Sequence, residues 1–179
     1  MRLNARMLFA LALLPVAACS TNPPPVASAP PPPPALASAD QTFINMAAAG
    51  DAGEIQSAQL AQTKAHRPAV KKFAAQMISD HTATTQQLTT IAQSKGATPT
   101  ATPSESAQDS MAKLEADRSA TFDRAYVRGQ VVDHQKMVQA YQDEIANGQD
   151  ADLKAFAQQT LPTVEKHLHE AQALSGRRG

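Results

Sequence analysis

The sequence has few of the residues that form disulfides or aromatic binding surfaces. Among 179 residues it has one cysteine, no tryptophan, two tyrosines and five phenylalanines. A single cysteine excludes an internal disulfide. The scarcity of aromatic side chains favours close helix packing rather than a large ligand cavity. The formal net charge is zero and no basic patch or polybasic motif occurs, so we expect no nucleic-acid partner.

Common catalytic motifs are also missing from the sequence. No Ser-His-Asp or Cys-His arrangement can be assembled with a characteristic spacing, and no glycine-rich phosphate loop occurs. The sequence therefore indicates no particular reaction. Any hypothesis that the protein is an enzyme depends on the metal site considered below.

An apolar run lies near the N-terminus but is too short to span a bilayer as a mature helix. Residues 7–16 form this run, preceded by two arginines, which predicts a signal peptide over residues 1–18. The following letters, VAAC, end at Cys19 and resemble the lipobox of bacterial lipoproteins, in which that cysteine carries the lipid. By this resemblance, Ser20 favours sorting to the outer membrane. The alternative is an ordinary signal peptide cut after Ala18, which leaves a free thiol.

A proline-rich segment separates Cys19 from the rest of the chain. Residues 20–39 read STNPPPVASAPPPPPALASA and have no periodic apolar face. At about 3.1 Å per residue, this extended segment could hold a domain as much as ~60 Å from a membrane. Together, residues 1–39 predict a lipid-anchored protein of the bacterial outer membrane that faces the periplasm. Its only expected membrane contact is the lipid on Cys19.

Four stretches with apolar residues at three- and four-residue steps predict four long helices. They cover residues 40–65, 68–95, 121–147 and 151–174. Asp40 is the expected N-cap of the first helix, and Pro68 suits the first turn of the second. Pro162 lies inside the last helix and is expected to kink it without ending it, because the apolar period resumes in phase.

An internal repeat relates the two halves of this pattern. VKKFAAQ from Val70 and LKAFAQQ from Leu153 match at an offset of 83 residues. The link at 96–118 has room for a short helix from Ser104 to about Ala116, and is long enough to cross the length of a bundle. We therefore expect an all-α, ferritin-like antiparallel four-helix bundle over residues 40–175. Two repeated hairpins would be joined by a long crossover, and residues 176–179 would form a disordered tail.

Each predicted long helix carries a glutamate or histidine at an inward position, and Asp51 lies one turn from the glutamate on the same stripe. The glutamate and the histidines are Glu54, His81, His134 and His167. His134 interrupts an apolar stripe that consists of Val127, Val131, Val138, Tyr141 and Ile145. At 1.5 Å per residue, each of the four polar residues lies roughly 20–25 Å from its turn, so we expect them at one level in mid-bundle. His66 and His169 fall off the stripes and are expected to face solvent.

Buried charge is costly unless it is paired or bound to a metal, so the presence of these four polar residues in the interior requires a physical explanation. Glu54, His81, His134 and His167 would suit one zinc, copper or ferrous ion. The carboxylates expected to form hydrogen bonds to these ligands, on the side away from the metal, are those of Asp51, Asp80 and Asp133. The alternative is a hydrogen-bonded polar layer that sets the helix register and binds nothing.

The sequence does not decide which face of the second helix points into the bundle. His81 lies on one regular stripe, but Asp80 lies on another that is equally regular, with Phe73, Met77 and Thr84. Either side chain could therefore point into the bundle.

Four segments taken together resemble a known family. They are GDAGEIQSAQLAQ, PAVKKFAAQMISDHTATTQQL, FDRAYVRGQVVDHQKMVQAYQDE and DLKAFAQQTLPTVEKHLHEAQAL. This pattern, over about residues 40–174, is similar to the bacterial domain of unknown function 4142, which is often described as a predicted outer-membrane protein and grouped with ferritin-like bundles. The resemblance implies a helical bundle that faces the periplasm. It implies no activity.

Ferritin-like iron enzymes carry a Glu-x-x-His pattern that is missing here. Ile78, Val131 and Val164 stand three positions before the three inward histidines. The repeat partner of Glu54 is Met137, so the paired bridging carboxylates are missing too. We do not expect a ferritin-type di-iron oxidase.

Three hypotheses for function follow from these observations. The first is a lipid-anchored envelope protein with a structural or binding role that holds one metal ion between its helices. The second is a metalloenzyme or metal-detoxifying stress protein that uses the same four residues. The third is a protein-interaction module of the cell envelope, whose partner the sequence does not identify.

Overall fold

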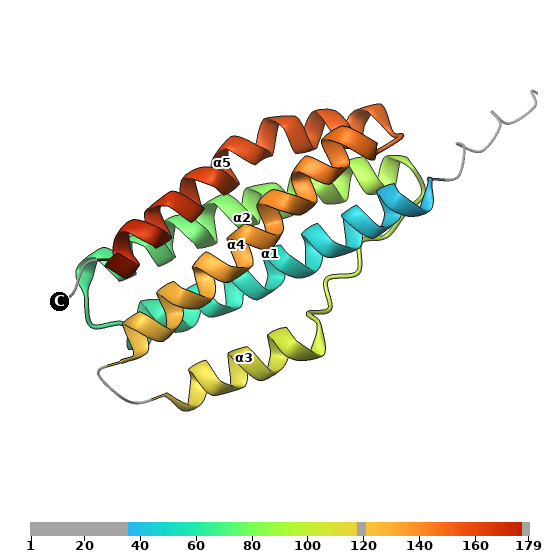
Figure 1. The fold of residues 1–179 in the computed structure, drawn as a ribbon. Helices are drawn as coiled ribbons and strands as arrows, with labels where there is room; N and C mark the ends of the chain where they lie inside the picture. The colour runs from blue at the N-terminus through green and yellow to red at the C-terminus, as the bar shows by residue number, and fades with distance from the viewer. Residues whose placement is uncertain (1–35, 118–120, 177–179) are drawn as a thin grey trace, which may run out of the picture. The chain divides into compact units, whose positions relative to one another are not determined.

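The computed structural model describes residues 36–117 and 121–176, and the regular structure in these ranges is entirely α-helical (Figure 1). The helices are α1 (Ser38–Lys64), α2 (Pro68–Ser94), α3 (Glu105–Ala116), α4 (Phe122–Asn147) and α5 (Ala151–Gly176). The predicted all-α class is confirmed. The predicted signal peptide, the lipidated Cys19, the tether as far as residue 35 and the tail from residue 177 lie outside the described residues. None of the described helices is long and apolar enough to cross a membrane.

Several helix ends follow local sequence signals. Pro68 is the first residue of α2, and Ser104 caps α3 by accepting the N–H of Ala107 at 3.3 Å. α5 continues through Pro162 as a single helix. The prediction of Asp40 as an N-cap is wrong, because α1 begins two residues earlier and Asp40 lies buried in its first turn.

Neighbouring long helices run antiparallel. Three-residue loops join α1 to α2 and α4 to α5, while α1 also lies beside α4 and α2 beside α5. At one end, Asp123 accepts the N–H of His66 at 2.9 Å; at the other, Asp40 accepts the N–H of Gln149 at 2.8 Å. These contacts place the end of α1 beside the start of α4. Residues 95–117 therefore lead back along the bundle, and they carry α3 along α1 and α4 (Figure 1).

The same contacts reveal how far the internal repeat extends. Asp40 and Asp123 are related by the offset of 83 residues, and so are His66 and Gln149. Each hairpin thus uses a buried aspartate near its start to accept a backbone N–H from the turn of the other hairpin. Asp123 also accepts the N–H of Arg67, at 2.7 Å. The sequence repeat is therefore also a structural repeat, in which each hairpin accepts hydrogen bonds from the turn of the other.

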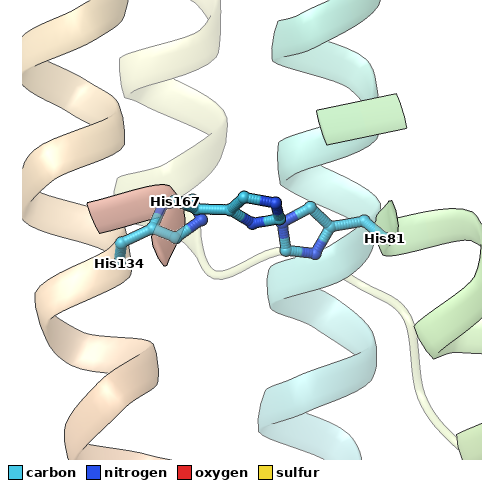
Figure 2. Close-up of side chains that lie close together, drawn as sticks. All are labelled: His81, His134 and His167. Atoms are coloured by element: carbon cyan, nitrogen blue, oxygen red, sulfur yellow. The ribbon is translucent and has the colours of Figure 1, made fainter. Parts of the chain in front are cut away.

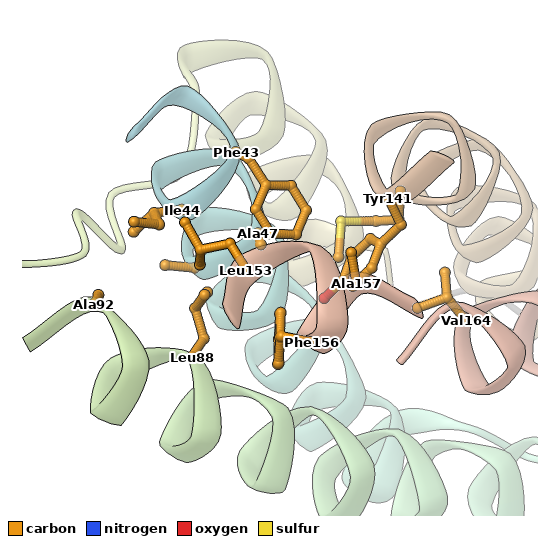
Figure 3. Close-up of a cluster of buried hydrophobic side chains, with 12 residues drawn as sticks. Phe43, Ile44, Ala47, Leu88, Ala92, Tyr141, Leu153, Phe156, Ala157 and Val164 are labelled. Atoms are coloured by element: carbon orange, nitrogen blue, oxygen red, sulfur yellow. The ribbon is translucent and has the colours of Figure 1, made fainter. Parts of the chain in front are cut away.

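A polar layer divides the apolar interior into two clusters. One cluster surrounds Phe43, Tyr141 and Phe156 (Figure 3), and the other surrounds Phe73 and Tyr126. On each long helix, one or two buried polar residues lie between the members of these two clusters. They are Asp51, Glu54, His81, Gln130, His134 and His167. The predicted polar level in mid-bundle is therefore present.

The buried face of α4 is rotated from the predicted stripe. Gln130, Met137 and Glu144 are buried, whereas Val131 and Val138 are only partly buried. Each of these three buried residues immediately precedes a predicted one, whereas Val127, His134 and Tyr141 of the predicted stripe are buried as expected. The buried face is therefore shifted by only part of the roughly 100° that separates successive residues. The prediction followed the aliphatic residues, but two of the positions that pack inward carry polar side chains.

Candidate metal centre

Three histidines from three helices meet in the polar layer. His81 comes from α2, His134 from α4 and His167 from α5, and their rings converge in the interior (Figure 2). The ring centroids lie 5.4 to 5.6 Å apart. One nitrogen from each ring lies within 4.8 Å of the other two, and all three residues are buried.

Each histidine is fixed by one hydrogen bond to a group behind it. The contacts are His81 Nδ1 to Asp51 Oδ1 at 2.7 Å, His134 Nδ1 to the Gln130 carbonyl at 2.9 Å, and His167 Nε2 to Asp80 Oδ2 at 2.9 Å. A carbonyl oxygen and an ionised carboxylate can only accept a hydrogen bond. The ring nitrogen in each contact must therefore carry the proton, which leaves a lone pair on the other nitrogen of a neutral imidazole.

The second nitrogen of each ring has no hydrogen-bond partner among the described residues. These atoms are Nε2 of His81, Nε2 of His134 and Nδ1 of His167. A buried acceptor without a donor costs about 1–3 kcal/mol. When all three rings are neutral, the three lone pairs also repel one another, and a cation between them would relieve both penalties.

The geometry of these nitrogens is close to that of a metal site. A metal ion binds imidazole nitrogen at about 2.0–2.1 Å, so tetrahedral ligands lie about 3.4 Å apart. Nitrogens within 4.8 Å of one another could reach that spacing through small side-chain rotations. Neutral imidazoles suit zinc, copper, iron and nickel, and a proton-bearing nitrogen hydrogen-bonded from behind is the usual state of a histidine ligand.

Glu54 lies beside the histidine cluster and not among its converging atoms. Its Oε1 is 3.7 Å from Nδ1 of His134, the nitrogen that faces away from the cluster, and its Oε2 has no hydrogen-bond partner among the described residues. Burial raises the pKa of Glu54 to about 7, although the nearby His81 opposes this shift. The structure thus brings together three of the four predicted ligands.

The three aspartates expected behind the histidines lie in different surroundings. Asp51 is fully buried, and its second oxygen accepts the hydroxyl of Thr85 at 3.0 Å. Asp80 holds His167 from the edge of α2, so His81, not Asp80, points into the interior. Asp133 instead lies at the surface and pairs with Lys136 at 3.3 Å. It precedes His134 by one residue and so points about 100° away from it.

The electrostatic environment keeps two of the histidines neutral. Burial, together with the neighbouring His81 and His167, lowers the pKa of His134 to about 3. Burial also lowers the pKa of His167, and Asp80 opposes that shift. For His81, burial lowers the pKa but the hydrogen bond and charge of Asp51 outweigh it, so the pKa is raised. Neutral imidazole is the form that binds metals, so a metal ion would have to displace the second proton that Asp51 favours on His81.

Gln130 is a part of the site that the sequence did not reveal. Its carbonyl fixes the tautomer of His134, and its side-chain amide donates to the hydroxyl of Ser57 at 3.2 Å. The available signal was its position four residues before His134, one turn away on the same face. The neighbouring Val131 concealed it, because an apolar residue was the more obvious member of the stripe.

The fold and the site together define an all-α bundle with a buried cluster of three histidines. The family described as Domain of unknown function (DUF4142) matches residues 25–174, and the chain belongs to this family. No curated protein matches the chain.

Two kinds of solved structure are similar to this bundle. A DUF305 fragment from Deinococcus radiodurans is 16% identical with a TM-score of 0.72, and the match covers 81% of this chain and 100% of the fragment. CopM in the Cu(II)-bound form is 21% identical with a TM-score of 0.64, over 76% of this chain and 95% of that one. The Cu(I)-bound form of CopM is 23% identical with a TM-score of 0.65, over 75% and 93% of the two chains. At these identities the similarity is one of fold.

Proposed function

We propose that this protein binds one transition-metal ion between its helices, through Nε2 of His81, Nε2 of His134 and Nδ1 of His167. The observation that carries this proposal is the convergence of three buried imidazole rings, each with one nitrogen that has no hydrogen-bond partner among the described residues. Copper is the first metal to test, because two structures of similar fold are described as copper-bound forms. Zinc and ferrous iron suit the same imidazole ligands.

The residues around the histidines would have distinct roles toward such an ion. Asp51, Gln130 and Asp80 each hold one ligand in its metal-binding tautomer. Glu54 is the nearest further donor, beside His134. Three protein ligands leave one coordination position for Glu54, water or another small ligand.

Metal analysis of the purified protein tests the proposal. We expect one equivalent of copper or zinc after incubation with the metal and removal of excess. The His81→Gln, His134→Gln double variant should bind none. The matched control is a His66→Gln, His169→Gln variant, which removes two exposed histidines and should keep the full equivalent. Equal metal contents in the two variants would contradict the proposal.

We also propose that the bundle is ferritin-like, with antiparallel hairpins joined by a crossover along the bundle. This is supported by the contacts of Asp123 with the first turn and of Asp40 with the second. Cysteines introduced at His66 and Arg124 should form a disulfide or be cross-linked by a short reagent within one molecule. Failure of that link, with efficient links between α1 and the opposite end of α4, would contradict the arrangement.

We propose that the domain is anchored to the outer membrane by a lipid on Cys19 and faces the periplasm. The proposal rests on the apolar run at 7–16, the lipobox-like residues that end at Cys19 and the proline-rich segment that follows. Several acyl chains on one cysteine would make the anchor stable. Labelling of bacterial cells with a radioactive fatty acid should mark the wild-type protein but not a Cys19→Ser variant. Equal labelling of both would contradict it.

A further inference from the structure

The three histidines are separated from solvent by the bundle around them. The exposed fractions of the side chains of His81, His134 and His167 are 3%, 0% and 1%. A metal ion can therefore reach them only along a path that opens between two helices, and the groups along that path should be polar.

The three hydrogen-bond acceptors behind the histidines differ in their access to solvent. Asp51 is fully buried and is covered by the hydroxyl of Thr85. Gln130 is only 2% exposed. The side chain of Asp80 is 34% exposed, yet its Oδ2 lies 2.9 Å from Nε2 of His167. Among the three acceptors, Asp80 is therefore the one that contacts both solvent and the cluster.

His167 is also oriented differently from the other two histidines. His81 and His134 direct Nδ1 outward to their acceptors, whereas His167 directs Nε2 outward to Asp80 and leaves Nδ1 for the cluster. Its ring therefore connects a solvent-accessible carboxylate on α2 with the interior. A second polar contact, between Gln87 and Gln159 at 3.4 Å, crosses the same pair of helices.

We propose that metal ions enter and leave the bundle between α2 and α5, and that Asp80 is the first residue to bind the incoming cation. This inference rests on the proposed metal site. The Asp80 carboxylate attracts the hydrated ion to the surface, and a rotation of the His167 side chain then brings the ion to its two partners. Release follows the same path in reverse. Asp80 therefore controls the rate of exchange.

Stopped-flow mixing of the full-length protein with Cu(II) tests this route. Tyr126 and Tyr141 lie about two turns on either side of His134, so quenching of tyrosine fluorescence reports binding. Mixing the loaded protein with excess chelator reports release. The test variant is Asp80→Asn, which removes the charge but keeps an acceptor for His167. Asp133→Asn is the matched control, because Asp133 is an exposed aspartate that directly precedes His134.

We expect Asp80→Asn to slow both binding and release by about tenfold, with one equivalent of copper still bound. Asp80→Glu, which keeps the charge, and Asp133→Asn should keep the wild-type rates. Unchanged rates in Asp80→Asn would overturn the proposed route. Faster release with unchanged binding would also overturn it, because Asp80 would then only orient His167. If the wild type binds neither Cu(II) nor Zn(II), the metal site itself is wrong, which is distinguishable from both results.

Discussion

The protons on three imidazole rings decide what the polar layer can bind. Asp51, the backbone carbonyl of Gln130 and Asp80 each accept a hydrogen bond from one ring nitrogen, so the other nitrogens meet as acceptors when the three rings are neutral. A polar layer that served only to fix the helix register would be expected to pair donors with acceptors. The arrangement of three acceptors favours a cation as the missing partner.

The lowered pKa of His134 predicts an acid-sensitive metal-free protein. Its pKa is about 3 when folded and 6.5 in the reference state, so between these values the unfolded chain binds the proton more readily. Stability is then lost as the pH falls below 6.5. Between pH 7 and pH 5, the free energy of unfolding should fall by about 2 kcal/mol more in the wild type than in His134→Gln. Urea titrations in the presence of a chelator measure this difference, and parallel pH profiles would contradict it.

Asp51 should be the most sensitive of the groups behind the histidines. In Asp51→Ala, His81 Nδ1 and the hydroxyl of Thr85 both lose a buried acceptor. We expect the free energy of unfolding to fall by about 2–4 kcal/mol. Thr85→Ala, which removes only the neutral contact, should cost about 1 kcal/mol. Equal losses in the two variants, measured by urea unfolding, would show that the Asp51–His81 contact contributes little.

The two hairpins are held together at their ends by equivalent aspartates in unequal surroundings. Asp123 accepts two backbone N–H groups, whereas Asp40 accepts one. Asp40 also lies near Glu144, and burial together with Asp40 raises the pKa of Glu144 to about 7. Removing Asp40 therefore relieves a repulsion as well as losing a hydrogen bond.

This difference between the repeats predicts unequal mutational costs. Asp123→Ala should lower the free energy of unfolding by about 2–3 kcal/mol, because two backbone N–H groups lose a buried acceptor. Asp40→Ala should cost about 1 kcal/mol or less. Chemical denaturation of both variants at pH 8, where Glu144 is largely ionised, gives the comparison. A larger loss for Asp40→Ala would mean that the two ends of the bundle are not related as described.

Helical periodicity was sufficient to predict the helices and to find the three histidines. His81, His134 and His167 were recognisable because each stands at an inward position of its helix, at a similar distance from a turn. Periodicity could not decide that the carboxylate of Glu54 stays outside the converging atoms, since that depends on side-chain rotamers. Nor could it decide that Asp80 reaches His167, because that contact joins helices 87 residues apart in sequence.

The rotation of α4 was missed for a related reason. Gln130 meets Ser57 and Glu144 meets Asp40, both on α1, and such long-range contacts leave no trace in the spacing of apolar residues. Asp40 was predicted to cap the first helix because the local sequence does not show its actual partner, the N–H of Gln149 in the second hairpin. The helices themselves were predictable, but the polar contacts between them were not.

In the whole molecule, the site lies where the two apolar clusters meet. Each of the four long helices contributes to both clusters and to the polar layer between them. A metal ion held by α2, α4 and α5 would therefore link both hairpins across the middle of the bundle. Binding at this position should stabilise the entire fold and not only the residues around it.

Thermal unfolding should reveal this link. At a free metal concentration about 100 times Kd, binding to the folded state adds about 2.7 kcal/mol, which corresponds to a rise in Tm of several degrees. The His66→Gln, His169→Gln control should show the same rise as the wild type. The His81→Gln, His134→Gln variant should show none. A rise of equal size in that variant would place the bound metal elsewhere.

X-ray absorption spectroscopy of the metal-loaded protein tests the proposed ligands most directly. With one equivalent of copper or zinc, we predict about three imidazole nitrogens at roughly 2.0–2.1 Å, with at most one further light ligand. The multiple-scattering pattern of imidazole should disappear in the His81→Gln, His134→Gln variant. A spectrum dominated by sulfur, or by oxygen without imidazole, would contradict metal binding by the three histidines.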